Sequence, residues 1–185
     1  MSALFEKVLA KALDKRSYRD GEVIRHTPIW DVVDRAQDIF ERELLGKTFR
    51  TKDGKNVAFT KRGMKELFYS ITGAMSGGSG AAINVFKQRD DDEDYMYDVL
   101  SIVPVLDDVI ADMDFSYYEP NKKRDKKPDV RKYDTYECDV VVDGEEREAK
   151  VRVEVPFNGP DRFYFHYLDE SLERRPIVVD GFKLL

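Results

Sequence analysis

The stretch that decides the fold of this chain is residues 133–168, YDTYECDVVVDGEEREAKVRVEVPFNGPDRFYFHYL. Apolar and polar residues alternate along 133–142 and again along 147–155, which is the period of a half-buried β-strand. An Asp-Gly pair between these two runs is a strong tight-turn signal, and FNGP forms a second turn before another strand-like run at 162–168. The pattern therefore predicts consecutive antiparallel strands, a β-meander.

Helical periodicity comes earlier in the chain. Apolar residues recur at three- to four-residue spacing along 2–16 and again after Thr27-Pro28, a pair that suits a helix start, until Gly46 ends the second helix. Trp30 falls on the apolar stripe of this second helix, so we expect its side chain to be largely buried.

Shorter signals fill the middle of the chain. An Asp-Gly turn predicts a small hairpin from 47 to 59, and Thr60 can cap a third helix that ends before Gly73. Apolar residues from 97 to 110 predict one or two helices interrupted near a proline, and the polar residues 119–132 predict an exposed loop. We therefore expect an α+β fold with N-terminal helices, followed by helices packed on an antiparallel β-meander.

Charge is distributed unevenly along the sequence. The formal net charge is −6. Seven lysines and arginines lie in 47–65 with a single acid, and seven more lie in 121–132 with two acids. Between them, 90–119 holds eleven acids and no lysine or arginine. Two interpretations stay open: solvated faces that pair with one another in the fold, or a basic cleft for a polyanion.

Several classes of protein lack their signatures here. No stretch is long and apolar enough for a membrane span, and no secretory signal begins the chain, so we expect a cytoplasmic protein, although export by a route without a cleaved signal stays open. The chain has one cysteine and two histidines, which cannot form a disulfide framework or a histidine-rich metal site. Consecutive acids at 90–94 are typical of a solvated loop. We expect neither a metal ion nor a cofactor.

His166 is a candidate catalytic residue because its proton exchanges near neutral pH. On an unbroken strand, side chains alternate between Tyr164, His166 and Leu168 on one face and Phe163, Phe165 and Tyr167 on the other. Tyrosines beside the imidazole could support acid–base chemistry. The alternative is a histidine packed inside an aromatic cluster.

The stretch FTKRGMKELFYS offers a second candidate group. Lys61 and Lys65 are four residues apart and share a helix face, and Ser70 lies five residues further on. Cations on a helix can hold a phosphate and stabilise the charge that develops during its transfer. An ordinary charged helix face is the alternative.

These motifs together resemble a known family. The basic helix, the hairpin sequence VDGEEREAKVRVEV and the final strand FYFHYLDES are similar to the barnase–EndoU–colicin–RelE-like nuclease domains carried by phage and mobile-element polyvalent proteins. The resemblance covers roughly residues 47–172. It implies an extension at 1–46 and an α+β nuclease-like domain at 47–185, or one compact unit.

The resemblance also implies roles for particular residues. Lys65 matches the position on the helix, and Tyr164 with His166 match the last strand, so these three are the expected catalytic residues. Lys65-Glu66 stands here where the family commonly has a lysine-histidine pair. Apart from the resemblance, the residues themselves make Arg162, Lys61 and Ser70 the expected substrate-binding residues.

Two functions follow from the sequence. One is metal-independent cleavage of RNA by a toxin or phage-borne effector, with RNA as substrate and an immunity or phage protein as partner. The other is a non-catalytic protein-binding module that uses the aromatic C-terminal strand and the acidic helix.

Overall fold

The computed structural model describes residues 28–89, 93–142, 144–170 and 177–179. The helix predicted at 2–16 lies outside the described residues. Within them, no helix has the length and apolar character that a membrane crossing requires.

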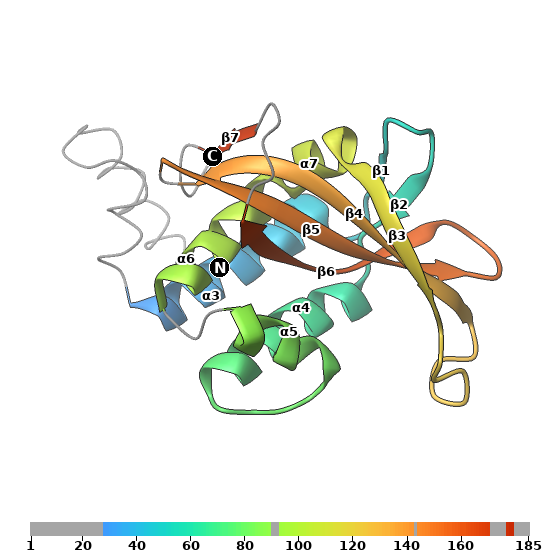
Figure 1. Ribbon diagram of the computed structural model, residues 1–185, viewed down its shortest axis with the longest axis horizontal. Coiled ribbons are helices and arrows are strands. Elements are labelled where there is room, and N and C mark those ends of the chain that lie inside the picture. The colour runs from blue at the N-terminus through green and yellow to red at the C-terminus, as the bar shows by residue number, and fades with distance from the viewer. Residues whose placement is uncertain (1–27, 90–92, 143, 171–176, 180–185) are drawn as a thin grey trace.

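The helices come first in the chain (Figure 1). In order, they are α3 (Ile29–Ile39), its π-helical continuation η1 (Phe40–Leu44), α4 (Lys61–Met75), α5 (Ala81–Arg89), α6 (Glu93–Ile102), the 3₁₀ segment η2 (Val103–Val105) and α7 (Leu106–Asp112). Three predictions are confirmed: the second helix, the Thr60 side chain as cap of α4, and the break near Pro104. Helix α5 follows the glycine-rich stretch and was not predicted.

The strands form one curled sheet. They are β1 (Thr48–Arg50), β2 (Asn56–Ala58), β3 (Asp114–Pro120), β4 (Val130–Val142), β5 (Glu145–Pro156), β6 (Asp161–Glu170) and β7 (Ile177–Val179). Their order is β1-β2-β6-β5-β4-β3, and β7 pairs with β4. Strands β4, β5 and β6 are antiparallel neighbours, as the meander prediction requires. Strand β3 adds to β4 antiparallel, and β2 joins β6 in parallel. The α+β class is confirmed.

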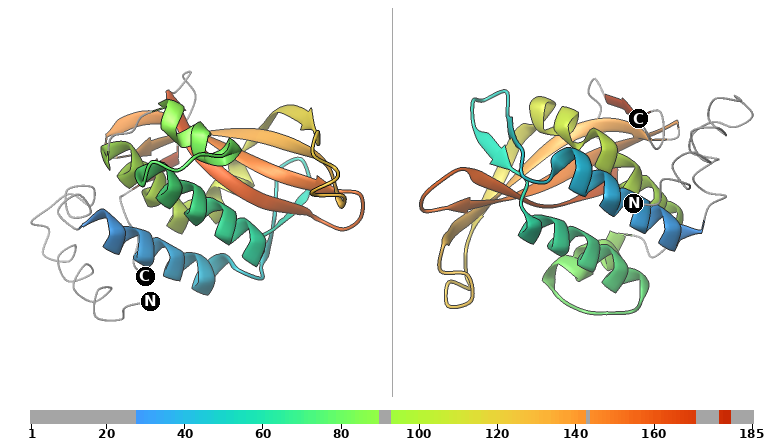
Figure 2. Two further views of the ribbon diagram at one scale, coloured as in Figure 1. Left: turned by 90° about the horizontal axis from the view of Figure 1, so that it is seen from below. Right: turned by 180° about the vertical axis from the view of Figure 1, so that it is seen from behind.

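The main core lies between the sheet and the helices. Figure 2 shows α3, α4 and α6 on the same side of the sheet. Phe59 and Phe163 stack with ring centroids 4.8 Å apart, and Phe40 from η1 packs against both. The predicted hairpin and the predicted last strand therefore meet the second helix in one hydrophobic cluster.

The prediction for Trp30 is wrong, because the side chain is 49% exposed. The buried stripe of α3 runs through Ile29, Val33 and Ala36 instead. Trp30 follows Ile29 directly and is rotated by about 100° around the helix axis, which turns it away from that stripe.

The polar loop is shorter than the sequence indicated. Strand β3 ends at Pro120 and β4 begins at the buried Val130, so the connection covers 121–129. Asn121 is only 6% exposed, and its amide nitrogen donates to the carbonyl oxygens of Lys127 and Val130 at 2.9 and 2.8 Å. The prediction of an exposed loop holds for its middle, while its two ends are anchored. We call residues 121–129 the basic loop.

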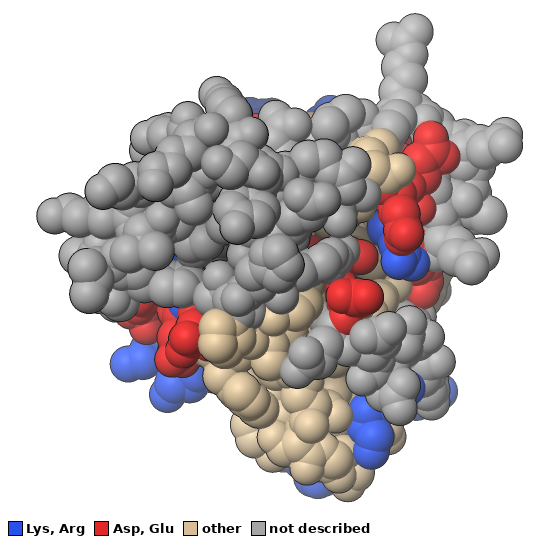
Figure 3. All heavy atoms as spheres, turned by 90° about the vertical axis from the view of Figure 1, so that its left-hand side faces the viewer, with Lys and Arg blue, Asp and Glu red and all other residues tan. Residues whose placement is uncertain are grey.

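Uncharged residues gather at one end of the molecule. In Figure 3 they occupy the lower end of the described surface, where Figure 1 places the connection between α4 and α5. Residues 73–86 contain no charged side chain. The charged groups of α4 therefore lie in its first half, on the part of the helix that faces the site described below.

Helix α4 approaches β6 closely at Gly63. A Cβ atom at this position would lie 2.2 Å from the backbone oxygen of Phe163. Replacing Gly63 by Ala is expected to lower the free energy of unfolding by about 1–3 kcal/mol, because the strand backbone cannot move aside.

Gly73→Ala in the same helix is the matched control. Its Cβ would meet the flexible end of the Ile83 side chain, which can shift. Both variants gain the same helix propensity from the change of glycine to alanine. The difference between their melting temperatures therefore reports the contact of the Gly63 position with the Phe163 backbone. If Gly63→Ala is at least as stable as Gly73→Ala, the close contact between α4 and β6 is disproved.

Candidate functional site

A buried carboxylate gathers three cations at the edge between α4, β6 and the basic loop. Glu154 on β5 is 2% exposed. Its carboxylate lies 3.4 Å from the Arg62 guanidinium, 3.1 Å from the Lys127 ammonium and 3.5 Å from the Arg162 guanidinium. The two basic segments of the sequence thus meet here, since Arg62 comes from the first and Lys127 from the second.

Asp129 holds the two guanidiniums from the solvent side. Its carboxylate lies 2.8 Å from Arg162 and 3.7 Å from Arg62. The hydrogen bond from Arg162 lowers the pKa of Asp129. Both arginine side chains remain partly exposed, 41% for Arg62 and 21% for Arg162.

A β-bulge brings Tyr164 to the same place. In the pairing of β5 with β6, Arg152 faces Phe165 but Val153 faces Phe163, so Tyr164 is the extra residue. Such an extra residue leaves the ladder and can re-aim its side chain. The face predicted for Phe163 on an unbroken strand is therefore wrong. Phe163 pairs with Val153 and His166 pairs with Val151, and these two valines share one face of β5, so Phe163 lies on the same face as His166.

The Tyr164 phenol joins a lysine to a second carboxylate. Its oxygen accepts from Lys127 Nζ at 3.2 Å, and its hydroxyl donates to Glu66 Oε1 at 3.1 Å. Burial raises the pKa of Tyr164, and the charge of Glu66 raises it further, so the phenol keeps its proton. We call Arg62, Glu66, Lys127, Glu154, Arg162 and Tyr164 the central cluster.

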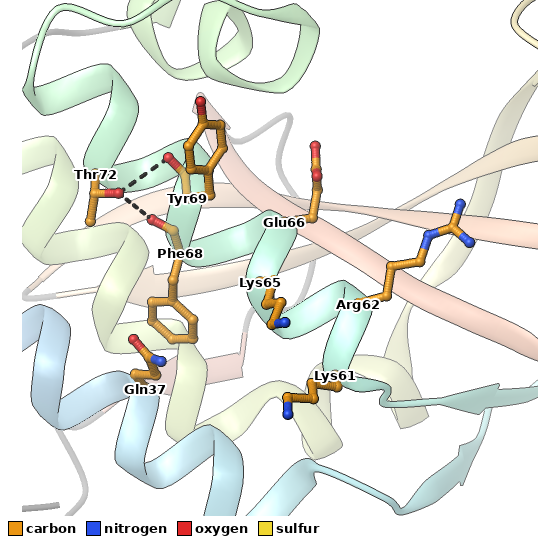
Figure 4. Close-up of a pocket in the computed structure, with 8 residues that line it drawn as sticks. All are labelled: Gln37, Lys61, Arg62, Lys65, Glu66, Phe68, Tyr69 and Thr72. Carbon is orange, nitrogen blue, oxygen red and sulfur yellow. Dashed lines mark hydrogen bonds between the residues drawn. The ribbon is translucent and has the colours of Figure 1, made fainter. Parts of the chain in front are cut away.

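Two hollows adjoin this cluster. The loop pocket has a volume of about 380 Å³, and its lining includes Tyr133, Tyr164 and the lysines of the basic loop. The helix hollow has a volume of about 700 Å³ along α4 and includes Lys61, Arg62, Lys65 and Glu66 (Figure 4). The hydrogen bond from Tyr164 to Glu66 therefore connects the linings of the two hollows.

The residues predicted on α4 divide into two groups. Lys61 and Lys65 are exposed and line the helix hollow, beside Glu66. Figure 4 shows Glu66 and Arg62 projecting from α4 away from Gln37 of α3. Ser70 is buried, and its hydroxyl donates to the Glu66 carbonyl oxygen of the same helix at 2.5 Å, so it lines neither hollow.

The structure does not bring His166 into the central cluster. The ring is fully buried, and Nε2 lies 2.9 Å from the Val99 carbonyl oxygen of α6. Burial lowers the pKa of His166 to about 4, so the imidazole is neutral at physiological pH. A substrate at the surface does not meet this ring.

The aromatic strand is also turned inward. Phe163, Phe165 and Tyr167 are all buried, and Phe86 of α5 covers Phe165 with ring centroids 6.1 Å apart. The acidic helix contributes buried residues to the same core from Tyr95 to Leu100. These side chains stabilise the domain and do not form an exposed face.

Sequence reasoning missed four members of the central cluster as site residues. Glu154 looked like the solvent side of an alternating strand, and Arg62 and Lys127 were members of charge runs. Glu66 had one signal, its place beside Lys65 where the nuclease domains that the sequence resembles commonly carry histidine. Within the described part of the chain, no group of three or more His, Cys, Asp or Glu is arranged to hold a metal ion.

The fold and the central cluster define an α+β domain with a polar site where a helix meets the bulged strand of a meander. The chain belongs to the family described as Large polyvalent protein-associated domain 3, whose model matches residues 31–167. It is therefore a domain of the polyvalent proteins of mobile elements. The match begins within α3, earlier than residue 47. No curated protein and no solved structure matches the chain.

Proposed function

We propose that the central cluster cleaves RNA through attack of the 2′-hydroxyl on the adjacent phosphate, without a metal ion. The observation that carries this proposal is the hydrogen-bonded chain from Lys127 through Tyr164 to Glu66, flanked by Arg62 and Arg162. A proton acceptor, a proton donor and cations for the phosphate are the groups that this reaction needs.

Glu66 serves as the general base. Its carboxylate is partly exposed at the helix hollow and accepts a hydrogen bond from Tyr164. It removes the proton of the 2′-hydroxyl while the 2′-oxygen forms a bond to phosphorus. Glu154 is nearly inaccessible, and its role is to hold the three cations in place.

Lys127 serves as the general acid. As the bond between phosphorus and the 5′-oxygen breaks, the ammonium gives a proton to that oxygen. Lys127 donates a hydrogen bond to the Tyr164 oxygen and the Tyr164 hydroxyl donates one to Glu66, so the phenol stands between the acid and the base and positions both. The guanidiniums neutralise the negative charge of the phosphorane. The products are a 2′,3′-cyclic phosphate and a free 5′-hydroxyl.

The resemblance to the nuclease family supports the same site. Lys65-Glu66 occupies the position at which those domains commonly have lysine and histidine, and Tyr164 matches the last strand. The hydrogen bond between Tyr164 and Glu66 supports giving Glu66 the role of the base in this chain. The proposal retains Arg162 as a phosphate-binding residue, as the sequence predicted. RNA cleavage of this kind suits a toxin or effector carried by a mobile element.

Wild-type protein is expected to cut single-stranded RNA of mixed sequence in excess EDTA. The reason is that every group in the proposed mechanism comes from the chain. Gel electrophoresis of labelled RNA measures the cleavage. Tyr164→Phe, which keeps the ring and removes the hydroxyl, is expected to cut more slowly. Complete dependence on an added divalent ion would contradict the proposal.

A further inference from the structure

We infer that the loop pocket is a subsite for one unpaired nucleotide next to the cleaved phosphate, so that the substrate is single-stranded RNA. This inference rests on the proposed function, since the pocket shares Tyr164 and Lys127 with the central cluster. It adds the class of RNA that the site accepts.

The charge of the loop pocket suits a nucleic-acid backbone. Its lining holds five cationic side chains and one acidic side chain: Lys122, Lys123, Lys126, Lys127, Arg152 and Glu119. The lysines come from the basic loop, which is anchored at both ends. Asn121 donates to the carbonyl oxygens of Lys127 and Val130 at one end, and the Phe157 amide donates to the Asp129 carbonyl oxygen at 3.1 Å at the other. The cations are thus displayed on an anchored loop, and phosphate binding does not require the loop to order first.

The walls of the pocket suit a base. Tyr133 and Tyr164 lie with their ring centroids 5.5 Å apart and both line the pocket. Burial raises the pKa of Tyr133 to about 12, and the charge of Glu154 adds to the effect, so its ring carries no charge at physiological pH. Aromatic side chains beside a cationic groove are the usual means of holding single-stranded nucleic acid, because every base can stack on them.

The size of the pocket favours a single nucleotide over a duplex. Its volume of about 380 Å³ suits a single nucleotide and not a base pair with its backbones. A base in a duplex is stacked and paired, and it would have to leave the helix to reach Tyr133. An RNA strand with an unpaired nucleotide can place that base in the pocket and its neighbouring phosphate on Arg162 and Lys127.

The test is a binding measurement with full-length protein and an RNA that cannot be cut. A fluorescent single-stranded 2′-O-methyl RNA and its duplex are titrated with protein, and anisotropy reports binding. We expect the single strand to bind more tightly. Tyr133→Leu is expected to weaken binding of the single strand by roughly 5- to 100-fold, the range for loss of one stacked base. Tyr133→Phe keeps the ring and should bind like the parent.

Tyr118→Leu is the matched control, because Tyr118 is an exposed tyrosine on β3 outside the pocket. Equal affinity for duplex and single strand, or normal binding by a folded Tyr133→Leu variant, would overturn the subsite. Polyglutamate of the same total charge should not displace the RNA. If it does, the pocket recognises negative charge alone, and the nucleotide subsite is overturned. A wild-type protein that binds the single strand but cuts no RNA would overturn the proposed function and leave the subsite standing.

Discussion

Replacing Glu66 by Gln is expected to lower the rate of RNA cleavage by about 10²–10⁴-fold, the usual contribution of a general base. The amide keeps the size of the carboxylate and can still accept the hydrogen bond from the Tyr164 hydroxyl. It cannot take the proton of a 2′-hydroxyl. The change therefore removes the proposed chemistry and leaves the geometry in place, so the melting temperature should change little.

Glu41→Gln is the matched control for this variant. Glu41 is exposed on η1 and does not belong to the central cluster. Initial cleavage rates of the two variants and the parent, measured in EDTA on the same RNA, give the comparison. If folded Glu66→Gln protein cuts as fast as Glu41→Gln protein, Glu66 is not the base.

A second large effect is expected at His166, on stability against pH. The folded-state pKa of about 4 lies well below the ordinary value of 6.5. Between these values the unfolded chain binds a proton at this position and the folded chain does not. Stability therefore falls as the pH drops from about 6.5 to about 4, by roughly 3 kcal/mol for this group, and the loss is complete below pH 4.

The variant His166→Gln isolates this contribution. Glutamine does not titrate, and its side-chain amide can donate to the Val99 carbonyl oxygen as the ring nitrogen does. Urea unfolding at a series of pH values should show a shallower loss of stability for the variant in that window, and its cleavage rate should stay near that of the parent. A pH dependence identical in both proteins, or a large loss of cleavage in a stable variant, would contradict the packed-core role of His166.

Much of the fold could be predicted because it depends on local signals. Alternation, an Asp-Gly turn and the FNGP turn located β4, β5 and β6, and Thr60 located the start of α4. Strand β3 was missed because its sequence DFSYYEP is short and two adjacent tyrosines, Tyr117 and Tyr118, interrupt the alternation. The burial of Trp30 was predicted wrongly because the apolar residues of α3 span a wider arc of the helix than the core covers.

The candidate site could be predicted only in part because it depends on pairing between distant elements. The bulge at Tyr164 inserts one residue into β6, and the pattern FYFHYL is the same with or without it. Burial of Glu154 depends on three cations from separate parts of the chain. His166 has the residue type of a catalyst, but α6 covers it with the Val99 carbonyl oxygen. Residue type alone could not separate these cases.

The most direct test of the central claim compares one single-stranded RNA with its fully 2′-O-methylated form in EDTA, with the termini of the products identified by mass spectrometry. Attack by the 2′-hydroxyl predicts that only the unmodified RNA is cut, and that the fragments carry a 2′,3′-cyclic phosphate and a 5′-hydroxyl. Cleavage of both RNAs, fragments with 5′-phosphate ends, or intact RNA after incubation with folded protein would contradict it.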